Sequence, residues 1–146
     1  MKITQRHISA LALSTALFTA MPAVADQPAY CAAIASSQAA AEKLFVMVDS
    51  SQFEQAWLAG SQALQKQLKK DDWLRSLEGG RSALGNVSSR KLRSLTYSTS
   101  FPGMPDGEYV LFHYETTFAN KSSTTETAVM QKEADGQWRH SGYLIK

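Results

Sequence analysis

The sequence predicts an α+β fold, with helices in the first half and a four-stranded antiparallel sheet in the second. Apolar residues recur at helical spacing between Ala29 and Leu84. From Lys91 to Ile145, runs rich in Tyr, Phe, Thr and Val alternate with turn residues. Neither a repeat nor a Pro- or Ser-rich linker separates the two halves. We therefore expect a single domain over residues 26–146.

The helical half is expected to begin with a long helix over Ala29–Val48, which is rich in alanine. The polar run Asp49–Ser51 ends that helix and offers candidates for the cap of the next one. A short second helix carries Phe53 and Trp57 four residues apart, and Gly60 interrupts it.

Two more helical stretches follow. Ala63–Leu68 is amphipathic over one or two turns. The acidic pair Asp71-Asp72 begins the next helix, where negative charge suits the helix dipole. Gly79-Gly80 weakens that helix, Arg81–Leu84 resumes it, and Gly85-Asn86 closes it.

The second half predicts four consecutive strands joined as a curved meander. Prolines around Asp106-Gly107 make the first connection a rigid turn. Asn120-Lys121 and Asp135-Gly136 mark the two later turns. The strands are expected over Lys91–Phe101, Glu108–Phe118, Ser123–Glu133 and Gln137–Ile145.

The two later turns predict the strand register. A three-residue loop at Ala134–Gly136, with glycine in the left-handed position, pairs Met130 with His140. It also pairs Ala128 with Gly142 and Glu126 with Leu144, and a loop at Ala119–Lys121 pairs Phe112 with Ala128 and Tyr114 with Glu126. Both registers gather one apolar face: Val110, Phe112, Tyr114, Phe118, Ala128, Met130, Trp138 and Leu144.

The opposite sheet face carries a second set of apolar residues. Adjacent exposed apolar residues predict a contact surface, so we expect a homodimer through this face. The residues are Tyr109, Leu111, Val129, Tyr143 and Ile145.

Residues 1–25 have the features of a secretory signal peptide. Lys2 and Arg6 precede the apolar stretch Ile8–Phe18, and Ala23–Ala25 is a small-x-small cleavage site. The apolar stretch is too short to span a membrane. We expect cleavage after Ala25, a periplasmic or secreted protein, and no membrane attachment afterwards.

Charge and cysteine content exclude several partners. The chain has 15 basic and 13 acidic residues, and removal of Lys2 and Arg6 leaves the two signs equal. A balanced chain has no long-range field for nucleic acid or anionic lipid. The single cysteine, Cys31, cannot form an internal disulfide. A semi-buried helix residue and an intermolecular disulfide are both open interpretations for it.

Several stretches carry a family resemblance. They are Arg81-x-x-Leu84-Gly85, Ser89–Leu92, Pro102-Gly-Met-Pro-Asp-Gly-Glu-Tyr-Val110, Thr117–Lys121, Glu126, Asp135–Arg139 and Gly142-Tyr143. Through them the chain closely resembles the domain of unknown function 4019 family over nearly all of residues 26–146. The resemblance implies an exported bacterial protein without assigned activity, and a cystatin-like or nuclear-transport-factor-like cone. That fold hosts enzymes, ligand binders and dimerisation modules. His140 stands where the family pattern usually has an apolar residue.

The histidines and glutamates of the sheet do not predict a metal or catalytic centre. His113 and His140 fall on strands separated by a third, about 9.5 Å apart at ~4.8 Å per strand, and point to opposite faces. Zinc needs its nitrogen ligands at roughly 2.0–2.1 Å. Glu115 and Glu126 also point to opposite faces, and no serine or cysteine stands in a nucleophile motif. We expect no metal, no cofactor and no catalytic residue that can be named.

Glu126 is the strongest candidate for a functional residue. The register places it on the concave face beside Tyr114, where an ionised carboxylate needs partners. Arg90 and Arg81 can supply charge-assisted hydrogen bonds. Two interpretations are open: a structural ion pair that joins helices to sheet, or the polar anchor of a ligand pocket. The pocket walls would be Trp57, Trp73, Tyr97, Phe112 and Trp138.

His140 is expected to be a core histidine whose burial resists protonation. We predict a non-enzymatic module that binds a small ligand or another protein. The alternative is a cone-fold enzyme that uses Glu126 or His140 as general acid or base. The candidate pocket residues are Glu126, Tyr114, Arg90, Arg81, Trp57 and His140.

Overall fold

The computed structural model describes residues 27–146, and the predicted signal peptide lies outside them. Four helices precede four strands, which confirms the predicted α+β class. The elements are α1 (Gln27–Asp49), α2 (Phe53–Leu58), α3 (Gln62–Gln67), α4 (Lys70–Leu84), β1 (Val87–Ser98), β2 (Tyr109–Phe118), β3 (Lys121–Lys132) and β4 (Trp138–Ile145).

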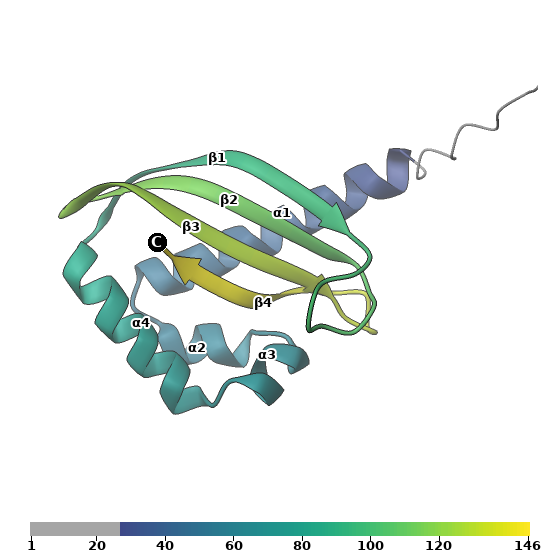
Figure 1. Ribbon diagram of the computed structural model, residues 1–146, viewed down its shortest axis with the longest axis horizontal. Helices are drawn as coiled ribbons and strands as arrows, with labels where there is room; N and C mark the ends of the chain where they lie inside the picture. Colours follow the sequence, from purple (N-terminus) through teal and green to yellow (C-terminus); the bar gives the residue numbers. More distant parts are fainter. Residues whose placement is uncertain (1–26) are drawn as a thin grey trace, which may run out of the picture.

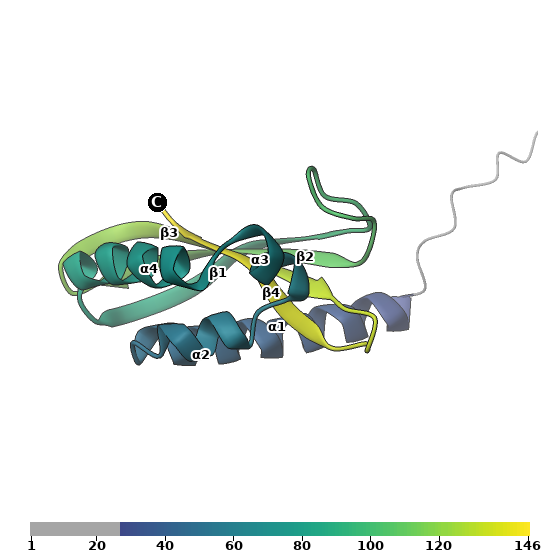
Figure 2. The ribbon, with the colours of Figure 1, turned by 90° about the horizontal axis from the view of Figure 1, so that it is seen from below.

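The strands form one antiparallel sheet in the order β1-β2-β3-β4. Helix α1 crosses one face of this sheet, and α2, α3 and α4 gather beyond the β4 edge (Figure 1). In Figure 2, α1 and α2 lie on one side of the sheet, and the β1–β2 loop rises on the other. We call the face beneath α1 the inner face and the opposite one the outer face.

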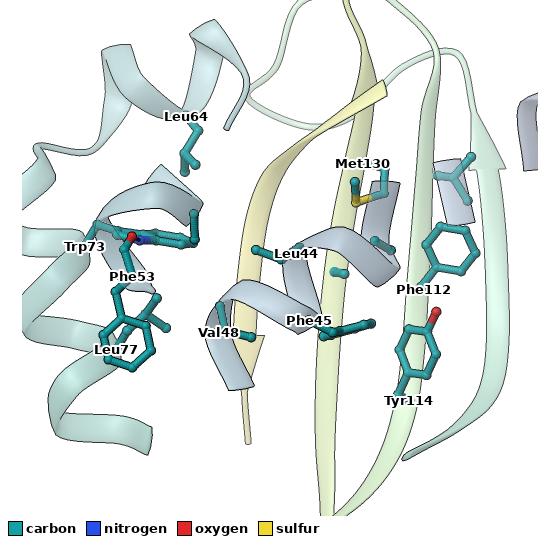
Figure 3. Packing of buried hydrophobic residues seen from close by; sticks show 14 residues of the cluster. Leu44, Phe45, Val48, Phe53, Leu64, Trp73, Leu77, Phe112, Tyr114 and Met130 are labelled. Atoms are coloured by element: carbon teal, nitrogen blue, oxygen red, sulfur yellow. Dashed lines mark hydrogen bonds between the residues drawn. The ribbon is translucent and has the colours of Figure 1, made fainter. Parts of the chain in front are cut away.

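The core has two neighbouring parts (Figure 3). Leu44 and Phe45 of α1 pack on Phe112 of β2, and the Phe45 and Tyr114 rings lie 4.9 Å apart, edge to face. By length and a mean hydropathy of 1.2, α1 could cross a membrane. One face of the helix, which carries Ala41, Leu44 and Val48, is buried in the core.

The second part of the core joins α2 to α4. Trp73 and Leu77 of α4 are buried against Phe53 of α2. The Trp73 indole Nε1 also donates a hydrogen bond to the Phe53 carbonyl at 2.9 Å. This part holds the helical layer beside the sheet rather than beneath it.

The sequence predicted that Gly79-Gly80 weakens α4, but the helix runs through both glycines. Its buried residues, Trp73, Leu77, Arg81 and Leu84, lie at helical spacing on both sides of the pair. Tertiary packing of such a stripe outweighs the low helix propensity of glycine. The predicted stop at Gly85-Asn86 is confirmed, since Gly85 has a φ of 75°.

Replacing Gly79 with alanine should therefore stabilise the protein. A Cβ at Gly79 meets nothing within 4 Å, and alanine is favoured over glycine inside a helix by roughly 0.5–1 kcal/mol. Denaturant unfolding should show a gain of that size. Gly85→Ala is the matched control and should destabilise, because alanine is strained at a φ of 75°. An unchanged stability for Gly79→Ala would contradict the prediction.

Much of the predicted register is confirmed. Met130 pairs with His140, Phe112 with Ala128, and Tyr114 with Glu126. The left-handed glycine of the last hairpin is also present, because Gly136 has a φ of 78°.

Beyond His140 the predicted β3–β4 register is wrong by one residue. An irregularity between Val129 and Met130 makes Ala128 pair with Tyr143 and Glu126 with Ile145. A bulge adds one residue to a strand and moves every later side chain to the other face. Tyr143 and Ile145 therefore lie on the inner face, and Leu144 lies on the outer face, 53% exposed.

Tyr109 and Val129 are on the outer face, as predicted, but both are buried. The β1–β2 loop covers Tyr109: the Tyr109 hydroxyl donates a hydrogen bond to the Pro105 carbonyl at 2.6 Å, and its ring lies 6.0 Å from that of Phe101. Phe101 thus belongs to this loop rather than to β1.

Two local predictions about turns and caps are also wrong. The β2–β3 turn has two residues, because Phe118 pairs with Lys121. The run Asp49–Ser51 does not cap α2, whose N-cap Gln52 makes no side-chain capping bond.

Candidate functional site

A buried cluster of charges lies where α1, α4 and the sheet meet, and Glu126 is at its centre. The Glu126 side chain is fully buried. Arg90 donates to it from Nε at 2.6 Å and from Nη2 at 3.2 Å. Thr116 donates a third hydrogen bond at 2.5 Å, and the Tyr143 hydroxyl donates a fourth. Both carboxylate oxygens are thus fully engaged.

Asp49, the last residue of α1, completes the cluster. It accepts from Arg81 Nη2 at 2.8 Å and from Arg90 Nη1 at 2.9 Å. Arg81 Nη1 lies 3.7 Å from Glu126 Oε1. Two arginines and two carboxylates therefore balance, and they tie α1, α4, β1 and β3 together.

Aromatic rings enclose the arginines. The Arg90 guanidinium lies 4.0 Å from the centre of the Phe45 ring, and that of Arg81 lies 4.7 Å from the Phe118 ring. Burial alone would lower the pKa of Arg90, but hydrogen bonds to Asp49 and Glu126 outweigh burial and raise that pKa. The Arg90 guanidinium therefore keeps its positive charge beside the two carboxylates.

Burial and the neighbouring Glu126 charge raise the pKa of Tyr143 well above its usual value. The hydroxyl proton is thereby held on Tyr143, where it serves as a donor to Glu126. Glu126 is fully bonded and surrounded by donors, so it has no free lone pair with which to take a proton from a substrate.

The six predicted pocket residues fall into two places. Glu126, Arg90 and Arg81 are in the cluster, and Tyr114 packs beside it against Phe45. Trp57 and His140 lie instead at the helical end of β4. There the Trp57 indole donates to the Leu68 carbonyl at 3.2 Å.

His140 is buried between β4 and the helices. Its ring lies 5.6 Å from that of Trp73, and its backbone carbonyl accepts a hydrogen bond from Ser61 N at 2.8 Å. Its Nε2 has no hydrogen-bond partner among residues 27–146. Burial lowers the pKa of His140 from 6.5 to about 4, and the Ala56 backbone offsets only part of that effect.

Within the described part of the chain, no three His, Cys, Asp or Glu side chains come together as metal ligands. His113 is on the outer face, where its Nδ1 lies 3.0 Å from Thr127 Oγ1, whereas His140 is on the inner face. The two histidines therefore cannot share a metal ion.

A groove of ≈ 680 Å³ runs between α1 and the start of β4, and we call it the α1–β4 groove. Small and apolar side chains make up most of its wall, and charged residues stand among them. Val46 is 64% exposed, and Leu58, next in sequence to the lining residue Ala59, is 60% exposed. The lining residues are Ala39, Ala40, Glu42, Lys43, Val46, Met47, Ala59, Trp138, Arg139 and His140.

Two smaller grooves flank the charged cluster. One of ≈ 510 Å³ is lined by Asp49 and Arg81, among others, and one of ≈ 360 Å³ by Asp49, Arg90 and Tyr114. Neither is lined by Glu126. Solvent therefore reaches the cluster mainly at Asp49, whose side chain is 31% exposed, whereas the arginines are largely buried and Glu126 is fully buried.

Sequence reasoning missed Asp49, Tyr143 and the whole α1–β4 groove. Asp49 did carry a signal: an acidic residue at a helix C-terminus opposes the helix dipole and needs a compensating cation. Tyr143 was assigned to the other face because a bulge leaves no trace in an alternating pattern. The groove depends on how α1 crosses β4, which no local pattern encodes.

Comparison with known proteins gives one match. Neither the curated proteins nor the solved structures contain a match to this chain, so no structural neighbour confirms the cystatin-like or nuclear-transport-factor-like resemblance. A family profile, described as protein of unknown function (DUF4019), matches residues 40–143. This range includes the charged cluster and most of the α1–β4 groove. The chain belongs to the DUF4019 family.

Proposed function

We propose that this protein is an exported, non-enzymatic binding module that holds a small apolar or amphipathic ligand in the α1–β4 groove. The observation that carries the proposal is the groove itself. Its volume of ≈ 680 Å³ lies within the range of about 300–1,000 Å³ common for small-ligand sites.

The wall of the groove suits an amphipathic molecule. Ala39, Ala40 and Met47 offer an apolar floor on α1, and Trp138 offers an aromatic wall on β4. Lys43 stands at the same groove and makes no ion pair within residues 27–146. Such a site combines apolar contact area with a few polar groups that orient the ligand.

The chemistry of the buried groups favours binding over acid–base catalysis. Glu126 accepts four hydrogen bonds inside the cluster and does not line either flanking groove. His140 is neutral at neutral pH, since its pKa is about 4, and it lacks a carboxylate partner that would make it a stronger base. The charged cluster therefore has a structural role, since its ion pairs connect α1 and α4 to the sheet.

Export is part of the proposal because of residues 1–25. The basic start, the apolar stretch Ile8–Phe18 and the Ala23–Ala25 site together fit a secretory signal. These residues lie outside the described part of the structure. N-terminal sequencing of protein taken from the periplasm or medium would test cleavage after Ala25.

Two substitutions test the groove with the neutral fluorescent probe N-phenyl-1-naphthylamine. Val46→Arg places a charge at the apolar wall, and Ala39→Trp fills the space without adding charge. We expect saturable binding to the wild-type protein and at least about tenfold weaker binding to both variants, which corresponds to 1.4 kcal/mol.

The control is Leu144→Arg, which makes the same kind of change on the outer face, where Leu144 is 53% exposed. It should bind the probe like the wild-type protein. Absence of saturable binding to the wild-type protein, or equal binding to all four proteins, would overturn the groove as a ligand site. Native mass spectrometry of protein purified from its own compartment would then report a natural ligand directly.

A further inference from the structure

We infer that the outer face of the sheet packs against the same face of a second copy, which gives a two-fold homodimer with both α1 helices on the outside. This inference rests on the sheet alone and does not depend on a ligand in the α1–β4 groove. The residues that form the contact differ from those that the sequence predicted, because the β4 bulge exchanges Tyr143 and Ile145 for Leu144.

The centre of the outer face carries no charged side chain. Leu111 and Val129 are paired across β2 and β3, and Leu144 stands beside them on β4. Most of the surrounding residues have small polar side chains, and one is glycine. The central set is Ser94, Thr96, Leu111, His113, Thr127, Val129, Gly142 and Leu144.

Charged residues stand toward the ends of this face. Arg93 and Glu115 form an ion pair at one end, where Lys91 also faces outward opposite Glu115, and Arg139 binds Asp135 near the other. An uncharged centre with a charged and polar rim is the usual composition of a protein interface. The Arg93–Glu115 and Arg139–Asp135 charges are paired within one copy, so like-charge repulsion from an approaching copy would be limited to rim lysines such as Lys91.

The shape of the face also suits a second sheet. Gly142 and the serine and threonine residues keep the side chains of the centre small, so that two sheets can approach to about 10 Å. The β1–β2 loop covers Tyr109 and closes one end. The surface available to a second copy is therefore the part of the outer face that this loop leaves uncovered.

The area of this patch is near the minimum for a specific dimer. Four strands at ~4.8 Å and about eight residues at ~3.3 Å, which include the charged rim as well as the uncharged centre, give on the order of 500 Å² per copy, or about 1,000 Å² in total. Specific interfaces bury at least about 1,000 Å². A two-fold pairing uses the same patch twice, so the expected product is a dimer with a dissociation constant in the micromolar range rather than a permanent one.

Sedimentation equilibrium over a wide range of concentrations tests the inference, with reductant present so that exposed Cys31 cannot link two chains. We expect the wild-type protein to shift from monomer to dimer as its concentration rises. Leu144→Arg should raise the dissociation constant by at least about 100-fold, because the symmetric contact would bury the charge twice.

Thr96→Arg is a second variant on the same face, at an exposed position of β1, in case Leu144→Arg fails to fold. Val46→Arg is the matched control on the other side of the molecule and should dimerise like the wild-type protein. A monomer at every concentration, or a dissociation constant that neither outer-face variant changes, would overturn the inference. Val46→Arg is expected to weaken probe binding only, and Leu144→Arg is expected to weaken dimerisation only. The ligand proposal and the dimer proposal can therefore fail independently of each other.

Discussion

Replacing Glu126 with glutamine should lower the free energy of unfolding by about 3 kcal/mol, because removing one partner from a buried ion pair leaves the other uncompensated. Glu126 is fully buried, and Arg90 contacts it through two nitrogens. Glutamine has the same shape but only one acceptor oxygen. It would also present an amide N–H₂ group to donors such as Thr116 and Tyr143. Denaturant unfolding at neutral pH would measure the loss.

The matched control is Glu115→Gln, which breaks the Arg93–Glu115 pair on the same strand as Thr116. The Arg93 and Glu115 side chains are 61% and 39% exposed. Exposed pairs contribute roughly 0–1 kcal/mol, so this change should cost less than about 1 kcal/mol. Equal losses for Glu126→Gln and Glu115→Gln would contradict the structural role of the cluster.

A double variant separates charge balance from packing. Glu126→Gln combined with Arg90→Gln removes one charge of each sign and leaves the Asp49–Arg81 pair intact. The two losses should add to more than the loss measured for the double variant, with a coupling energy of about 1–3 kcal/mol. Probe binding in the α1–β4 groove should be unchanged in Glu126→Gln, since Glu126 does not line that groove.

The turns of the sheet explain why so much of the site could be predicted. Gly136 is a local signal that places Met130 opposite His140. Glu126 pairs with Tyr114 as predicted although the β2–β3 turn has two residues rather than three, because a register shift between Thr116 and Phe118 compensates for the shorter turn. A buried glutamate then requires cations, and the nearby arginines of α4 and β1 are the candidates. Those steps need no knowledge of tertiary packing beyond the face that α1 covers.

The errors share one physical origin, namely contacts made between distant elements. The bulge in β4 turns Tyr143 toward Glu126, and the segment before α3 covers the same edge through the Ser61–His140 hydrogen bond. α4 stays helical through Gly79-Gly80 because its buried stripe packs on α2. In each case a long-range contact outweighs a local preference, and the sequence pattern shows only the local preference.

Between pH 6.5 and pH 4 the protein should lose about 3 kcal/mol of stability through His140 alone. Burial lowers the pKa of His140 in the folded protein to about 4, whereas the unfolded chain titrates near 6.5. In this window the unfolded state binds a proton that the folded state does not, so the free energy of unfolding falls as the pH falls. Well above pH 6.5 neither state is protonated at this residue, and its contribution to the pH dependence vanishes.

The structure identifies why burial dominates at this residue. Trp73 lies against the imidazole, and a Cβ added to Gly60 would stand 3.2 Å from Nε2, so the backbone of the α2–α3 connection closes over the ring. Burial lowers the pKa of His140, and a hydrogen bond with the Ala56 backbone partly offsets this effect. No neighbouring charge contributes to the shift. A proton on His140 would therefore be uncompensated, and acid should act first on the contact between β4 and the helices.

Denaturant unfolding at several pH values, with and without His140→Val, measures the effect. The variant should keep a nearly constant free energy of unfolding between pH 6.5 and 4.5, while that of the wild-type protein declines. Asp135 does not confuse the result, since hydrogen bonds from Arg139 lower its pKa to about 2, and the stability it contributes is lost only below pH 3.8. His113→Asn changes the other histidine of residues 27–146, which lies half-buried on the outer face, and should retain the wild-type decline. If His140→Val declines as steeply as the wild-type protein, the acid sensitivity belongs to another group and the assignment to His140 is wrong.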